Sequence, residues 1–292
     1  MRWEYTETTR NTYKITGAAG VSGIVSVPGT IGGIRVDEIG SRAFEGITDI
    51  TGIELPDGIR VIGSYAFYNC RNLRTLSMTD STEELSDGAI RMCPNLSEVR
   101  IRMLRSGYRL IKELLGDTEN MILLALSLPD GYAKLVFPGY YQEYREDPWA
   151  RVIHQSIIGS GYSYRVCVSR KGIDFEEYDE CFLRGEMAGD PAADKIALAR
   201  LMYPYRISER ALSYYNGYLE KHCGRILTQL VRDGDSEGCG FLVRTVRIPD
   251  DVFDQCLRIA SSERETEITG ILMEAAGGES QKNEPGSFFF DI

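Results

Sequence analysis

The sequence is poor in the residues and segments on which many enzymes, secreted proteins and membrane proteins depend. It contains two histidines in 292 residues. Histidine is the side chain that most often moves protons or binds metals near neutral pH, so acid–base and metal chemistry have few residues to use. No apolar run approaches the ~18 residues of a membrane-spanning helix. The N-terminal segment Met1–Thr6 also lacks the apolar core of a secretory signal.

The net charge limits the kinds of binding partner, and the cysteine content limits the cellular compartment. With 33 basic and 43 acidic residues the net charge is −10, which disfavours binding to nucleic acids or to anionic membranes. The seven cysteines are an odd number without a C-x-x-C pair. This usage is typical of buried, reduced thiols rather than of a disulfide framework or a zinc site. We therefore expect a cytoplasmic protein without cofactor or metal, the alternative being the cell surface if a signal peptide is missing from this segment.

A repeat of 23 residues dominates the first third of the chain. The segment Ile39–Phe44 returns as Ile62–Phe67 and, with substitutions, as Leu85–Ile90. Other residues recur in the same register: Ile50, Leu73 and Leu96; Ile53, Leu76 and Val99; Leu55, Met78 and Ile101; Cys70 and Cys93. A fixed period of about 20–29 residues with apolar side chains at fixed offsets indicates a leucine-rich-repeat solenoid. In it Phe67 is expected to stack over Phe44 of the preceding coil.

The repeat unit has a recognisable consensus. The segment IELPDGIRVIGSYAFYNCRNLRTL (residues 53–76) resembles the BspA-like leucine-rich repeats, over residues about 24–101. The resemblance implies a short parallel sheet and a binding role, since members of that family are known mostly as cell-surface binding proteins of bacteria and protozoa. The third unit departs from the consensus, as terminal repeats often do, so we expect the solenoid to end near residue 104.

Each repeat strand turns one face toward solvent, because side chains alternate across a strand. Residues 53 and 55 are expected to point inward and residues 52 and 54 outward. The corresponding outward positions on the next two strands make Glu54, Ser77 and Arg100 candidate contacts for a partner. A solvated sheet face without a ligand is the alternative interpretation.

The middle segment, residues 105–185, contains a predicted β-hairpin and many aromatic residues. Two apolar runs, Met121–Leu126 and Ala133–Phe137, flank the turn Pro129–Gly131. The candidate recognition residues are Tyr140, Tyr141, Tyr144, Trp149, Tyr162 and Tyr164. Tyrosine and tryptophan dominate binding hot spots, although the same rings could pack the junction between the solenoid and the following helices.

An enzyme centred on residues 140–180 is a further alternative. Its reactive groups would be His154, Ser160 and Cys167. The Gly159–Gly161 tripeptide is not the G-x-S-x-G elbow of hydrolases, however, and no strand–turn–helix context surrounds Ser160. We therefore expect no catalytic residues.

Apolar residues recur with helical periodicity across residues 186–277, and the breaks between these helices suggest stacked helical hairpins. The last pair, residues 253–260 and 267–273, resembles the helix pair of ankyrin-like repeats. A plain bundle that caps the solenoid is the alternative. Residues 278–292 form a polar, linker-like tail that ends in Phe288, Phe289, Phe290 and two further residues. These rings are expected to dock on the body, to bind a partner or to mediate self-association.

Together these patterns predict an α+β protein in four parts. They are a leucine-rich-repeat solenoid with a short parallel β-sheet (1–104), an aromatic-rich α/β connecting segment with a β-hairpin (105–185), an α-helical hairpin or repeat domain (186–277) and a flexible tail (278–292). The predicted function is a non-enzymatic, intracellular bacterial scaffold that binds proteins through the solenoid, the tyrosine-rich junction and the helical domain. A surface adhesin of the BspA-like type is the alternative.

Overall fold

The structure is a computed structural model that describes residues 1–147, 152–184, 190 and 192–277. The chain divides into two compact units, Met1–Ala211 and Leu212–Ile292. The first unit holds every strand and helices α1 to α4, and the second holds most of α5 and all of α6 to α8.

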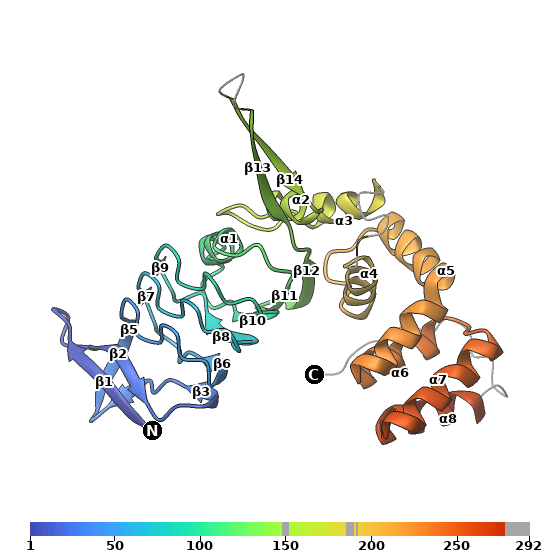
Figure 1. Ribbon diagram of the computed structural model, residues 1–292, viewed down its shortest axis with the longest axis horizontal. Coiled ribbons are helices and arrows are strands. Elements are labelled where there is room, and N and C mark those ends of the chain that lie inside the picture. The colour runs from blue at the N-terminus through green and yellow to red at the C-terminus, as the bar shows by residue number, and fades with distance from the viewer. Residues whose placement is uncertain (148–151, 185–189, 191, 278–292) are drawn as a thin grey trace. The chain divides into compact units, whose positions relative to one another are not determined.

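A six-stranded sheet forms one wall of the solenoid (Figure 1). Its strands, in spatial order, are β12 (Gly131–Phe137), β11 (Ile122–Leu128), β10 (Glu98–Arg102), β8 (Thr75–Thr79), β6 (Ile50–Glu54) and β3 (Gly23–Ser26). Neighbouring strands from β3 to β11 run parallel, and β12 pairs antiparallel with β11. The register places Val99 beside Leu76 and Leu124, so the inward apolar residues of successive coils form continuous rows.

A second sheet covers the opposite side of each coil. It contains β1 (Arg2–Glu7), β2 (Tyr13–Ala19), β5 (Ile34–Ile39), β7 (Val61–Ile62) and β9 (Glu84–Leu85), with β4 (Thr30–Ile31) paired to β5. The strands β2, β5, β7 and β9 are parallel, while the β1–β2 pair is antiparallel. This hairpin precedes the first repeat, and the 23-residue pattern does not extend to it.

The residues that define the repeat are those that one coil presses against the next. Phe67 stacks on Phe44 with ring centroids 5.4 Å apart, which confirms the expected column, and both rings are fully buried. A Cβ atom on Gly63 would lie 2.5 Å from the backbone nitrogen of Ser41, so the glycine lets the coils approach. The thiols of Cys70 and Cys93 donate to the carbonyls of the preceding coil, each at 3.0 Å. Close stacking therefore explains why these positions repeat.

The parallel sheet continues past residue 104, where we expected the solenoid to end. The predicted hairpin is present as β11 and β12, but β11 pairs in parallel with β10 from Glu98–Leu123 to Arg102–Ser127. Helix α1 (Arg109–Gly116) takes the place of the short strand of the preceding coils, with Leu110, Ile111 and Leu114 buried. A coil built with a helix instead of the repeat consensus is invisible to a 23-residue register.

The rest of the first unit follows β12. Strands β13 (Tyr141–Asp147) and β14 (Val152–Ile158) form a separate two-stranded ribbon, followed by α2 (Gly161–Val166), α3 (Phe175–Leu183) and α4 (Ala193–Met202). Figure 1 shows the ribbon extending from this region as a sheet of its own. A bidentate ion pair joins buried Arg200 to Asp179, at 2.8 and 2.9 Å, and ties α4 to α3.

The second unit is helical. It comprises most of α5 (Glu209–Asp233), α6 (Ser236–Thr245), α7 (Asp250–Glu263) and α8 (Thr266–Gly277), and α8 packs against both α6 and α7. Asp235 caps α6 by accepting a hydrogen bond from the backbone of Gly238 at 2.8 Å. Among the described residues, no helix has the length and apolar composition needed to cross a membrane. The α+β class, with a repeat solenoid before a helical domain, is confirmed.

Candidate interaction site at the junction

The sheet face carries the first group of predicted contacts. Glu54, Ser77 and Arg100 lie in one row, because the register pairs Ser77 with both of the others. Glu54 accepts a hydrogen bond from Ser26 at 2.5 Å, and Arg100 pairs with Glu98 of its own strand. Glu54 and Arg100 thus each have a partner on the sheet itself, and β6, β8 and β10 carry no aromatic side chain.

A groove lies where the last repeat meets the connecting segment. We call it the junction groove, and its volume is about 760 Å³. Three stretches of the first unit line it: residues 69, 71 and 91–94 of the repeat turns, residues 116–120 between α1 and β11, and Tyr140 with Gln142 at the start of the ribbon. This volume is within the range of ~300–1,000 Å³ that is usual for ligand sites.

Hydrogen bonds fix the 117–120 segment against the last repeat. The carboxylate of Asp117 accepts from the backbone of Gly88 at 3.0 Å and of Ile90 at 2.9 Å. Burial raises the pKa of this carboxyl group above its usual value. The side-chain amide of Asn120 donates to the carbonyl of Cys93 at 2.8 Å. One wall of the groove is therefore rigidly attached to the repeat turns.

A buried arginine holds the other wall. The guanidinium of Arg165, from α2, donates to five carbonyl oxygens, those of Leu115, Pro138, Gly161, Thr118 and Asn120. It also lies 4.8 Å from the ring centre of Tyr140. Burial lowers the pKa of Arg165 to about 10, so the group remains charged at neutral pH. Arg165 thus joins the end of α1, the 117–120 segment, the end of β12 and α2 at one point.

The tyrosines of the junction separate into two groups. Tyr140 lines the groove, and Tyr162 contacts it edge-on with ring centroids 6.1 Å apart. Tyr144 donates from its hydroxyl to Gln142 at 2.7 Å, on the groove side of the ribbon. Tyr144 is 62% exposed and Tyr162 is 48% exposed. Tyr141, 54% exposed, pairs across the ribbon with Ile158 and lies on the opposite face, since neighbouring residues of a strand alternate.

Tyr164 is a correction to the expected recognition surface. It is fully buried, and its ring packs edge-on against Tyr178 at 4.9 Å. Tyr178 in turn exchanges hydrogen bonds with the backbone of Val136. Tyr164 therefore belongs to the core between α2, α3 and β12 and cannot contact a partner. Trp149 lies outside the described residues.

Met92 is a groove residue that the sequence did not point out. Each repeat has a left-handed residue at the same position, and the chain places Gly46, Asn69 and Met92 there with φ near +60° to +70°. Glycine and asparagine tolerate this region, whereas a bulky side chain does so at a cost of ~1–2 kcal/mol. Met92 is nevertheless 58% exposed at the groove. An alignment of the repeats by the position that needs a positive φ, rather than by apolar residues, would have identified Met92.

The groups proposed for an enzyme have separate partners. Ser160 donates to Asp190 at 2.5 Å, while the sulfur of Cys167 lies 3.9 Å from that of Cys181. The hydrogen bond to Cys181 and burial raise the pKa of the Cys167 thiol, which disfavours a nucleophilic thiolate. The side chain of His154 lies outside the described residues. Within the described ranges, no three His, Cys, Asp or Glu side chains are grouped to hold a metal ion.

Comparison with known proteins identifies the repeats. The BspA type leucine rich repeat region matches residues 33–109 in six copies, so this part of the chain is a BspA-type leucine-rich-repeat region. No match is found among curated proteins. Three solved structures illustrate the likeness. A leucine-rich repeat protein of T. pallidum is 23% identical, over 34% of this chain and 68% of that one, with a TM-score of 0.25.

The other two structures are of bacterial repeat proteins as well. One from Bacteroides capillosus is 23% identical, over 34% of this chain and 77% of its own, with a TM-score of 0.27. A leucine rich cell surface protein of Faecalibacterium prausnitzii is 17% identical, over 50% of this chain and 61% of its own, with a TM-score of 0.25.

Proposed function

We propose that this protein is a non-enzymatic scaffold that binds a protein partner in the junction groove. The observation that carries the proposal is the combination of the groove with two exposed rings near it, Tyr144 on the same face of the ribbon as Gln142 and Tyr162 in contact with Tyr140. Tyrosine is enriched in binding hot spots, and exposed tyrosines beside a hollow are therefore candidates for partner contacts. The leucine-rich repeats support a binding role, since such solenoids present a surface rather than a reactive centre.

Strain at Met92 supports the same location. A residue held in a costly conformation is retained where the surroundings or a function require it. Met92 projects into the groove with a flexible, polarizable side chain, which adapts well to apolar groups of a partner.

We also propose a cytoplasmic location. All seven cysteines are buried free thiols. Burial raises the pKa of Cys70, Cys93, Cys239 and Cys256, which keeps these thiols protonated at neutral pH. Thiols of this kind suit a reducing compartment. Fractionation of source cells followed by immunodetection would separate this location from the cell surface.

Affinity isolation from source cells with matched variants tests the binding role. Tyr144→Ser removes an exposed ring on the groove side, and Tyr141→Ser removes an equally exposed ring on the opposite face. We expect recovery of the specific partner to fall at least tenfold with Tyr144→Ser, as for a hot-spot residue, and by less than twofold with Tyr141→Ser. Equal losses, or the absence of an enriched partner together with activity in a hydrolase screen, would reject the proposal.

A further inference from the structure

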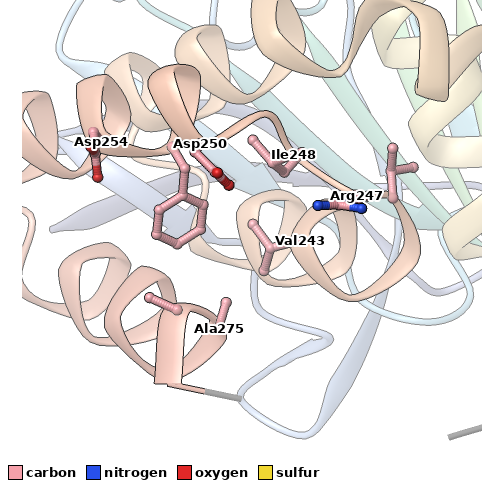
Figure 2. Close-up of a pocket in the computed structure, with 9 residues that line it drawn as sticks. Val243, Arg247, Ile248, Asp250, Asp254 and Ala275 are labelled. Carbon is pink, nitrogen blue, oxygen red and sulfur yellow. The ribbon is translucent and has the colours of Figure 1, made fainter. Parts of the chain in front are cut away.

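A second groove lies within the helical unit, independently of the junction. Its volume is about 360 Å³, and its lining comes from the end of α6, the start of α7 and the last turn of α8. Figure 2 shows Val243, Arg247 and Ile248 on one side, Asp250 and Asp254 along α7, and Ala275 on α8. We call it the α6–α8 groove.

The lining of this groove is about equally apolar and polar, and it includes one basic and two acidic side chains. Val243, Phe253 and Ala275 are half-buried, so their apolar surfaces remain partly in contact with solvent. Arg247 is exposed at one side and takes part in no ion pair with the described residues. Asp250 and Asp254 are exposed along α7. Apolar rings would cover the apolar part of the lining, and an acidic group beside them would pair with Arg247 if it lies on the Arg247 side, away from the carboxylates of α7.

The chain itself carries such a segment a short distance away. Ala275 and Ala276 line the groove, and the described part of α8 ends at Gly277. Ten residues, 278–287, then lead to Phe288, Phe289, Phe290 and Asp291. They include glycine, serine and proline, and a chain of ten residues with the composition of a Gly/Ser-rich linker spans about 17 Å on average. The tether therefore begins at the groove and is long enough to return to it.

We infer that residues 288–291 of the same chain occupy the α6–α8 groove. The phenylalanine rings cover the surface left by Val243, Phe253 and Ala275, and Asp291 faces Arg247. A short tether gives an effective concentration on the order of 1 mM, so even weak docking is sufficient. With a dissociation constant of about 0.1 mM for the free segment, roughly nine chains in ten would be closed.

Competition with a peptide tests this inference. The probe is a fluorescent peptide of residues 281–292, titrated into the full chain and into a chain that ends at residue 280, with fluorescence anisotropy as the readout. We expect the shortened chain to bind the peptide about tenfold more tightly, because nine-tenths of the full-length grooves are already filled. Replacing Phe288, Phe289 and Phe290 together by alanine in the full chain should give the same gain, without altering the folded body.

Matched variants of α8 locate the peptide. In the shortened chain Ala276→Glu, at the groove, should weaken peptide binding at least tenfold, whereas Met273→Glu, exposed on the same helix but outside the groove, should not. Equal peptide affinity for the full and shortened chains would overturn the inference, as would no binding to the shortened chain. Concentration-dependent dimers of the full chain that vanish on shortening would assign the groove to a second copy, and would overturn it too. None of these outcomes depends on the junction groove.

Discussion

The stacked coils and the junction use aromatic residues in opposite ways. In the coils, Phe44 and Phe67 lie face to face and are fully buried. At the junction, Tyr144 and Tyr162 have about half or more of their surface exposed. The coil rings contribute to stability, since burying such a side chain contributes ~1.5–3 kcal/mol. The junction rings gain little from folding, and the proposed function assigns them to contact with a partner.

The largest test of this contrast is Phe67→Ala. Removing a fully buried ring from the column leaves a cavity between two coils, which should lower the free energy of unfolding by ~3–5 kcal/mol. Tyr144→Ala, an exposed ring of similar size, should change it by no more than about 0.5 kcal/mol. Urea titration followed by circular dichroism measures both. Similar destabilisation by the two substitutions would show that the junction tyrosine is part of the core.

Arg165→Lys is expected to have the next largest effect. A single ammonium group cannot reach five carbonyl oxygens on four segments, so some of them become buried without a donor, at ~1–3 kcal/mol each. We expect a loss of roughly 2–4 kcal/mol in urea titration, and weaker partner recovery because the wall that carries Tyr140 loses its support. Arg71→Lys, at an exposed arginine of the same groove, is the control and should leave stability unchanged. A stable Arg165→Lys protein would mean that the carbonyls find other donors.

Met92→Asn should act in the opposite direction on stability. Asparagine is the residue of the preceding repeat at this left-handed position, and it should relieve strain by about 1 kcal/mol. The same substitution removes an exposed apolar side chain from the groove, so partner recovery should fall. The combination of a higher unfolding midpoint with weaker binding would separate function from folding at one residue. A loss of stability would instead show that the Met92 side chain packs against the rest of the folded chain.

The buried thiols of Cys70 and Cys93 provide the smallest test, because no change in stability is expected at neutral pH. Burial raises the pKa of Cys93 to about 11 and that of Cys70 to about 12. Both raised values mean that stability is fully present below pH 9 and declines as the pH rises toward 11 and 12. At pH 8 mass spectrometry should find neither thiol alkylated by iodoacetamide in the folded protein, and both alkylated in urea. Rapid labelling of folded Cys93 would show that the groove opens to its floor.

The sequence predicts those parts of the fold in which neighbouring coils make the same contacts with the same residue types. Phe67, Cys70 and Gly63 recur because stacking imposes the same contact in each turn, so the period reveals them. The helix α1 and strand β11 continue the sheet with different residues, and no period marks them. The hairpin at Pro129–Gly131 was still predictable, because its turn residues and apolar runs are local signals.

The candidate site was predictable in composition but not in geometry. The tyrosine-rich stretch was visible, yet Tyr164 is in the core and Tyr141 is on the far face of the ribbon. Burial of Tyr164 depends on Tyr178 and Val136, which are distant in the sequence. Arg165 offered no signal, because its five partners are backbone carbonyls whose positions only the fold determines.

Photo-crosslinking in source cells tests the central claim most directly. A benzoylphenylalanine residue is introduced at Tyr144 on the groove side, at Tyr141 on the opposite face, or at Ser77 on the sheet face, and crosslinked proteins are identified by mass spectrometry. The account predicts one recurrent partner crosslinked from position 144, with little or no product from positions 141 and 77. A partner crosslinked from position 77 but not from position 144 would contradict it and assign binding to the repeat sheet.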